Sequence, residues 1–337
     1  MLTSPRILLR VDANNNVGMG HAIRLSGLVC LLRTRCDFFV AGNDETLKSA
    51  FPQAPIHVLA SDDNAGLRRV LETIKPDFVI VDLPPSIARP WKTIRDWAQV
   101  PVIALDDEGG ELDADLIING TVLDKYHQYK CPPDARILCG TQFTMIRPVF
   151  SAHSWSGVDT SVAIIVGSGE RAEVWALMLA SGAVDMSAWG AVRMVVGHSF
   201  KKYAQLASHC QQTGINLQRS LSGEALASLV SQSAVALITG GMIVYETLAM
   251  GVPAVVFPQI PNLVPEAEWF SAHGAIVDLN YDGGMDPLAV EKAVGHLLSN
   301  REAAVTMSSK QREILDGRGM ERAAAVIDSL LQSRLAK

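Results

Sequence analysis

Short runs of consecutive apolar residues alternate with longer amphipathic segments along the first half of the chain. The runs that predict strands are Ile7–Val11, Phe38–Ala41, Phe78–Asp82, Val102–Leu105 and Leu116–Ile118. The segments between them that predict helices include Gly20–Thr34, Asn64–Ile74 and Pro90–Ala98. Continuous apolar strands separated by helices are typical of a parallel sheet that helices cover on both faces.

The same alternation begins again after a small, polar segment at 151–157, which predicts a linker. The strands expected there are Ser161–Val166, Val192–Val196, Val235–Thr239 and Ala254–Phe257. The helices expected are Ala172–Ala180, Gly241–Met250, Asp286–Leu298 and a long one from Arg301 to Leu335. The pattern therefore predicts an α/β protein with two doubly wound, Rossmann-like domains, at 1–150 and 158–337, facing a cleft.

Composition narrows the functional class. The chain has 337 residues, 48% of them hydrophobic and 19% charged, and a net charge of −6, so it carries no electrostatic footprint for nucleic acid. Five cysteines without CxxC spacing favour a reducing, cytoplasmic compartment and disfavour structural zinc. The longest apolar region, Ala225–Pro258, is interrupted by Gly240, Glu246 and Gly251, and predicts a helix and buried strands rather than a membrane span.

The most informative segment joins the first strand to the first helix and contains Gly18, Gly20 and His21. Open α/β sheets bind ligands at this carboxyl edge, and a helix N-terminus there suits anions. The same helix dipole disfavours a protonated imidazole, so we expect His21 to be largely neutral and available as a base. The alternative is a structural corner in which His21 only caps or packs.

Two further glycine turns lie in the second half. Gly240 and Gly241 precede a helix beginning near Met242, where backbone N–H groups suit a diphosphate. Glu246, on that otherwise apolar helix, suits a ribose diol, unless it is simply an exposed helix residue. Other candidates at the same edge are the turn Gly167, Ser168 and Gly169, which alternatively is only a tight turn, and the loop that carries Asn262.

Together these residues resemble the nucleotide-sugar glycosyltransferases of the GT-B fold. They resemble more closely the pseudaminic acid pathway hydrolases that act on UDP-2,4-diacetamido-2,4,6-trideoxy-β-L-altropyranose. The resemblance covers about residues 6–280. The matching segments are Asp12 with Gly18-Met19-Gly20-His21 and Arg24, Leu105-Asp106-Asp107, Asp115 to Asn119, Gly140 to Phe150 with Arg147, and Gly240 to Pro253 followed by Asn262.

Three departures concern the substrate. The family usually carries a histidine and a tyrosine after the aspartate that matches Asp82, whereas this chain has Leu83 and Pro84. Its phosphate loop often ends in aspartate-proline, and here Glu170 follows Gly169. A glutamine often follows the asparagine that matches Asn262, and here Leu263 does. The loop after Asp82 is expected to face the sugar, so its change leaves the identity of the sugar open.

The resemblance implies that the chain releases UDP from a UDP-diacetamido-trideoxyhexose in pseudaminic (nonulosonic) acid biosynthesis, by water attack at the anomeric carbon with inversion. His21 is the expected base, with Asp12 as a second catalytic residue. The expected substrate contacts are Gly18, Gly20, Arg24, Asp82, Asn119, Arg147, Gly167, Ser168, Gly169, Gly240, Gly241, Met242, Glu246 and Asn262. For Asp12 and Arg147 the alternative is a buried structural ion pair. Asp106 and Asp107, adjacent in an extended segment, point to opposite faces, which favours a sugar contact or a turn over a metal pair.

Two other functions use the same residues. A GT-B glycosyltransferase would direct the His21 base at an acceptor hydroxyl, and a non-catalytic relative would only bind the nucleotide sugar. A Rossmann dehydrogenase fits poorly, because Gly18-Met19-Gly20 lacks the third glycine of the dinucleotide motif. We expect a UDP-sugar as substrate, neither metal nor cofactor, no nucleic acid partner, no integral membrane segment, and a monomer or weak dimer.

Overall fold

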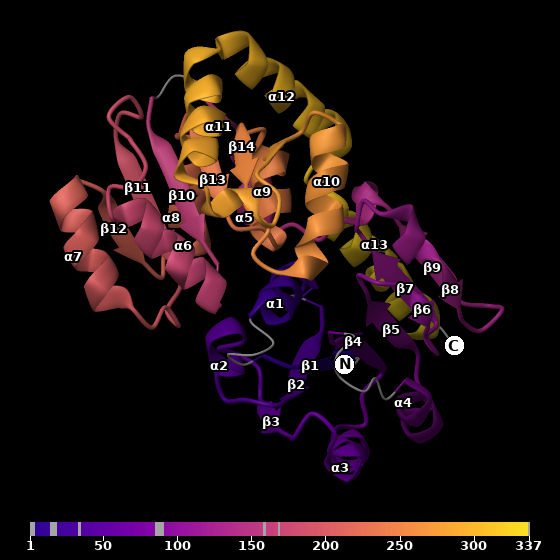
Figure 1. Cartoon of the computed structure of the whole chain (residues 1–337). Helices are drawn as coiled ribbons and strands as arrows, with labels where there is room; N and C mark the ends of the chain where they lie inside the picture. Colours follow the sequence, from indigo (N-terminus) through magenta and orange to yellow (C-terminus); the bar gives the residue numbers. More distant parts are fainter. Residues whose placement is uncertain are drawn as a thin grey trace. The chain divides into compact units, whose positions relative to one another are not determined.

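The computed structural model describes residues 4–13, 19–32, 35–84, 91–157, 160–167 and 169–335. The chain divides into two compact units (Figure 1). Unit 1 comprises Met1–Met145 together with Arg318–Lys337, and unit 2 comprises Ile146–Gly317.

Unit 1 is built on a seven-stranded parallel sheet of order β3-β2-β1-β4-β5-β7-β9. Its strands are β1 (Arg6–Val11), β2 (Asp37–Gly42), β3 (Ile56–Val58), β4 (Phe78–Asp82), β5 (Val102–Leu105), β7 (Leu116–Asn119) and β9 (Arg136–Cys139). A small ladder pairs β6 (Gly110–Glu111) with β8 (Tyr129–Lys130). The helices are α1 (Gly20–Leu32), α2 (Leu47–Ala50), α3 (Asn64–Ile74), α4 (Trp91–Ala98), α13 (Gly319–Leu335) and the 3₁₀ turns η1 (Asp124–His127) and η2 (Thr141–Phe143).

Helices cover both faces of this sheet because alternate strand residues point to opposite sides. In β1, Ile7 and Leu9 pack in one apolar cluster with residues of α1 and α13. Leu8 packs in the other cluster, with residues of α3 and α4. The C-terminal helix, yellow in Figure 1, thus completes the core of the unit that contains the N-terminus.

Unit 2 repeats the plan with a six-stranded parallel sheet of order β12-β11-β10-β13-β14-β15. Its strands are β10 (Val162–Val166), β11 (Val192–Val196), β12 (Asn216–Arg219), β13 (Val235–Ile238), β14 (Ala254–Val256) and β15 (Val277–Asp278). The helices are α5 (Pro148–Ser151), α6 (Glu170–Ala180), α7 (Tyr203–Thr213), α8 (Gly223–Ser231), α9 (Met242–Met250), α10 (Val264–Ala272), α11 (Pro287–Ser299), α12 (Arg301–Ile314) and the turns η3 (Pro261–Leu263) and η4 (Gly283–Met285).

The structure corrects the predicted boundaries in two places. The long helix expected from Arg301 to Leu335 is two helices, α12 and α13, and α13 belongs to unit 1 rather than to the second domain. The expected linker at 151–157 is part of unit 2, because the backbone N–H of Trp155 donates to Met250 O and that of Ser156 donates to Ser231 O.

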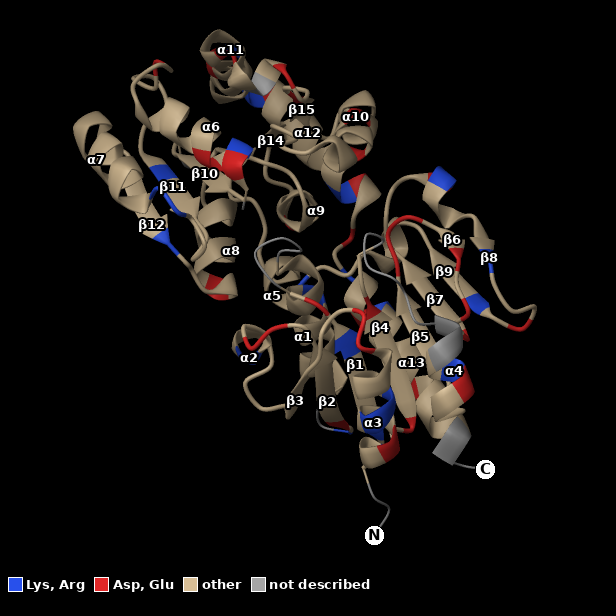
Figure 2. Ribbon diagram, turned by 60° about the horizontal axis from the view of Figure 1, so that its bottom comes forward, with Lys and Arg blue, Asp and Glu red and all other residues tan. Residues whose placement is uncertain are grey.

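The apolar region Ala225–Pro258 forms parts of α8, β13, α9 and β14, as predicted. Within the described part of the chain, none of the helices combines the length and the apolar character that a membrane crossing requires. Along the ribbon, Lys and Arg are interspersed with Asp and Glu (Figure 2).

Candidate functional site

Acidic and amide side chains stand at the carboxyl ends of neighbouring strands in unit 1. Asp12 follows β1, Asp82 ends β4, Asp106 and Asp107 follow β5, and Asn119 ends β7. Parallel strands bring these ends to one edge of the sheet. The strand order reverses between β1 and β4, and such a switch point is where open α/β sheets bind ligands.

His21 and Asp82 meet at this switch point. His21 is the second residue of α1, and its Nδ1 lies 2.7 Å from Oδ1 of Asp82. The His21 side chain is 19% exposed, whereas Asp82 is fully buried. A carboxylate at Nδ1 favours the tautomer that carries its proton there, so the other ring nitrogen, Nε2, is left to accept a proton.

Arg24, one turn further along α1, holds the same carboxylate from its other side. Its Nε donates to Oδ2 of Asp82 at 2.9 Å and its Nη2 donates to Oδ1 at 2.6 Å. Burial raises the pKa of Asp82, but the charges of Arg24 and His21 and the hydrogen bonds from both outweigh it and hold this pKa at about 2. Asp82 is therefore an anion at neutral pH, fixed by three donors.

Asp82 was expected to contact the substrate, and the structure places it behind His21 instead. Its buried oxygens face the imidazole and the guanidinium, so it orients the ring of His21. Leu83, which follows it, is 2% exposed and packs in the core with α3 and α4 residues. The departure from the family pattern at this position thus points into the protein.

The structure buries the side chains of Asp12 and Asn119, and their polar atoms have partners within unit 1. Asp12 forms an ion pair with Arg10, which is the structural alternative that the sequence left open. Asn119 donates to Tyr126 O at 3.0 Å and to the hydroxyl of Tyr129 at 2.7 Å, while its Oδ1 accepts from Thr121. Both side chains support the edge of the sheet rather than present free groups to a substrate.

The glycine turns of unit 2 lie at the corresponding switch point, after the neighbouring strands β10 and β13. They are joined by a hydrogen bond of 2.7 Å from the N–H of Gly167 to Oγ1 of Thr239. Gly169 precedes α6, and Gly241 precedes α9 with φ +84° and ψ −163°, a conformation that is nearly restricted to glycine. The first N–H groups of both helices have no intrahelical partner, so this edge suits an anion.

Five predicted residues remain, and the structure describes three of them. Met242 is the first residue of α9. Asn262 is exposed on η3, next to Leu263, whose side chain lies against Gly240. Gly20 begins α1 and is exposed. Gly18 and Ser168 lie outside the described residues.

Glu246 and Arg147, both in unit 2, bind each other. Nε of Arg147 donates to Oε1 of Glu246 at 2.6 Å, and Nη2 donates to Oε2 at 2.8 Å. The Glu246 side chain is 4% exposed. Burial raises its pKa, and the hydrogen bonds and charge of Arg147 oppose this only in part. Glu246 is thus a buried helix residue rather than an exposed one, and Arg147 forms the ion pair that the sequence left open.

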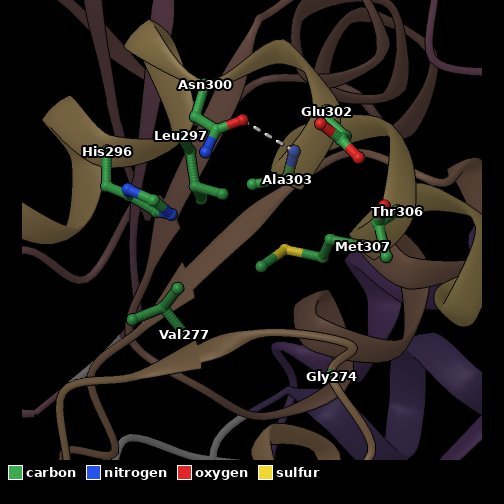
Figure 3. A pocket seen from close by; sticks show the side chains of 9 residues that line it. All are labelled: Gly274, Val277, His296, Leu297, Asn300, Glu302, Ala303, Thr306 and Met307. Atoms are coloured by element: carbon green, nitrogen blue, oxygen red, sulfur yellow. Dashed lines mark hydrogen bonds between the residues drawn. The ribbon is translucent and has the colours of Figure 1, made fainter.

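Unit 2 also contains a pocket of about 420 Å³, whose lining is drawn in Figure 3. The backbone N–H of Ala254, the first residue of β14, donates to Sδ of Met307 in the pocket wall, which places this wall at the amino edge of the sheet. The residues that line it are Gly274, Val277, His296, Leu297, Asn300, Glu302, Ala303, Thr306 and Met307. It shares none of the candidate site residues.

Several partners of the predicted residues were missed from the sequence. Asp107 accepts from Nη1 of Arg24 at 2.6 Å, and Thr239 joins the two glycine turns. The hydroxyl of Tyr129 donates to Oδ2 of Asp106 at 3.0 Å. Thr239 directly follows the apolar strand β13, and Asp107 is the second residue after the apolar strand β5. Their position at strand ends was the sequence signal that could have identified them.

Solved structures of other proteins share the architecture of this chain. The two parallel, Rossmann-like sheets with helices on their faces define an α/β protein of the GT-B type, as the sequence predicted. The chain is similar over 100% of both chains to the calicheamicin glycosyltransferase CalG4, with a TM-score of 0.66 and 18% identity. MurG of Acinetobacter baumannii has a TM-score of 0.65 and 15% identity, over 96% of this chain and 99% of that one.

Two further comparisons concern nucleotide binding and sequence. The UDP co-structure of Staphylococcus aureus MnaA has a TM-score of 0.66 and 15% identity, over 97% of each chain. By sequence, the chain is 20% identical over 332 residues to the spore coat polysaccharide biosynthesis protein SpsG of Bacillus subtilis (strain 168), covering 96% of this chain and 98% of that protein. No family model matches the sequence.

Proposed function

We propose that this chain is a nucleotide-sugar enzyme of polysaccharide biosynthesis that hydrolyses a UDP-sugar and releases UDP. The observation that carries the proposal is His21 on the carboxylate of Asp82 at the switch point of unit 1. The similar proteins include one glycosyltransferase by fold, one structure with UDP bound, and one polysaccharide biosynthesis protein by sequence.

In this proposal, unit 2 holds the UDP. The N–H groups at the starts of α6 and α9, after Gly169 and Gly241, bind the diphosphate and stabilise the charge that develops on the leaving group. Glu246 accepts hydrogen bonds from the ribose hydroxyls, and the Arg147 guanidinium opposes the rise in the pKa of its carboxylate that burial causes. The Arg147–Glu246 pair supports this assignment because a buried carboxylate without a counter-charge would favour its protonated form.

Unit 1 supplies the base. Nε2 of His21 accepts a proton from a water molecule while the water oxygen bonds to the anomeric carbon. The bond from that carbon to the diphosphate oxygen breaks, and UDP leaves with the bonding electron pair. The products are UDP and the free sugar with inverted anomeric configuration, and the imidazolium is stabilised by the anionic Asp82. The resemblance of the N-terminal motifs favours a diacetamido-trideoxyhexose as the sugar.

The test is UDP release from a panel of UDP-diacetamido-trideoxy sugars without any acceptor. Steady release with many turnovers is the expected result, and NMR of the first product formed gives the anomeric configuration. A glycosyltransferase is the second candidate, favoured by the fold of the calicheamicin glycosyltransferase CalG4. It would bind UDP but release it only after an acceptor is added, and that result would contradict the hydrolase.

A further inference from the structure

Arg24 donates a further hydrogen bond that has no part in the mechanism just described. Nη1 of Arg24 donates to Oδ1 of Asp107 at 2.6 Å. The Asp107 side chain is 38% exposed, whereas that of Arg24 is 9% exposed. A nearly buried guanidinium therefore connects the buried Asp82 at the end of β4 with a partly exposed carboxylate after β5.

This arrangement leaves the guanidinium little freedom. Arginine presents its N–H donors in a rigid, planar fork, and here Nε and Nη2 engage Asp82 while Nη1 engages Asp107. Two parallel hydrogen bonds fix the plane of the Asp82 carboxylate relative to the fork. His21 contacts Oδ1 of the same carboxylate, and its Nδ1 also lies 3.3 Å from Nη2 of Arg24, so the orientation of its ring depends on the orientation of Arg24.

The loop that carries Asp107 is itself held in place. Oδ2 of Asp106 accepts from the N–H of Glu108 at 3.1 Å, from that of Gly109 at 2.6 Å and from the hydroxyl of Tyr129 at 3.0 Å. The two adjacent aspartates thus have different tasks. Asp106 shapes the loop, and Asp107 reaches Arg24.

We propose that Arg24 and Asp107 are positioning residues that act through Asp82 to hold the His21 ring in its reactive orientation and tautomer. Two carboxylates and one guanidinium also give the cluster a net charge of −1, which meets the positive charge that His21 acquires when it accepts a proton. This inference rests on the proposed role of His21 as the base.

The test compares Asp107→Asn and Asp107→Glu with Asp113→Asn as a matched control. Asp113 is 37% exposed and pairs with Arg95 of α4 at 2.8 Å, so its exposure and partner resemble those of Asp107, away from His21. The first measurement is the ¹⁵N NMR spectrum of the neutral His21 imidazole, assigned with His21→Gln. The second is the separate determination of kcat and KM for UDP release.

We expect a single Nδ1–H tautomer in the wild type and in Asp113→Asn, and a mixture of tautomers in Asp107→Asn. In the same variant kcat should fall about 10-fold with KM changed less than about twofold, since small displacements of a catalytic group cost rate rather than binding. Asp107→Glu, which restores the charge, should recover part of both losses.

An unchanged tautomer in Asp107→Asn would overturn the inference whatever the rate, and an unchanged kcat in an active enzyme would overturn it as well. If the wild type releases no UDP from any sugar, the proposed function fails. The NMR comparison then still decides whether Arg24 and Asp107 control the His21 ring. Thermal unfolding monitored by circular dichroism confirms that each variant is folded before either measurement.

Discussion

Replacing Asp82 by asparagine removes one charge from the centre of the His21 cluster while keeping the shape of the side chain. Asp82 accepts hydrogen bonds of 2.6 and 2.9 Å from Arg24, and its Oδ1 lies 2.7 Å from Nδ1 of His21. An asparagine must turn its NH₂ group toward one of these donors, and among the described residues it leaves Asp107 as the remaining ion-pair partner of the buried Arg24. The variant therefore loses charge and hydrogen-bond geometry together.

The pKa of Asp82 gives the size of the effect. The shift from an ordinary 3.8 to about 2 corresponds to roughly 2 kcal/mol, at about 1.4 kcal/mol per pH unit. A donor facing a donor adds roughly 1 kcal/mol or more. We expect Asp82→Asn to lower the free energy of unfolding by roughly 2–4 kcal/mol at neutral pH.

The pH dependence has a definite sign. The folded-state pKa of Asp82 is lowered, so its stabilisation is present above 3.8 and is lost as the pH falls through about 2. In urea unfolding followed by circular dichroism, the difference between wild type and Asp82→Asn should be constant above about pH 5 and should shrink below about pH 4. Asp113→Asn, in a partly exposed ion pair, should cost less than about 1 kcal/mol. Equal costs for the two variants, or a difference that does not change with pH, would refute this reasoning.

Three further variants test other parts of the account. Glu246→Gln should weaken UDP binding about 10-fold by calorimetry, because a charge-assisted hydrogen bond to the ribose is lost; unchanged affinity would remove the ribose role. Arg147→Met, which leaves the buried Glu246 without a counter-charge, should destabilise the protein by roughly 3–5 kcal/mol in urea unfolding; a near-neutral effect would show that the pair is not required for stability. Gly241→Ala should cost roughly 1–3 kcal/mol through backbone strain alone, since nothing lies within 4 Å of the added Cβ, and a neutral result would contradict the φ of +84° at this position.

The central strands were predictable because they are buried on both faces. Every residue of β4, β5, β10 and β13 is buried, and each strand is a continuous apolar run in the sequence, apart from Asp82 at the end of β4. The edge strands β3, β9, β12 and β15 were missed. In β12, Asn216–Arg219, the residues are exposed or half-buried, so the strand has no hydrophobic signal and exists because it pairs with β11.

The sequence predicted which elements carry the candidate residues but not which residues they pair with. The sequence placed His21 and the Gly240–Gly241 turn at strand-to-helix junctions and Glu246 on the helix that follows, where the structure has them. It did not pair His21 with Asp82 or Arg147 with Glu246, because these pairs are separated by 61 and 99 residues and depend on the sheet order. Asp12 matched a motif, yet only the fold shows that Arg10, two residues earlier, takes its charge.

The most direct test of the central claim is the rate of acceptor-free UDP release by His21→Ala, with UDP affinity measured on the same preparation. We expect a loss in kcat of about 10²- to 10⁴-fold, the usual contribution of a general base, with the Kd for UDP nearly unchanged. His57→Ala, in the edge strand β3 of the same sheet, serves as the control and should keep the wild-type rate. Full activity in His21→Ala would contradict the assignment of His21 as the base.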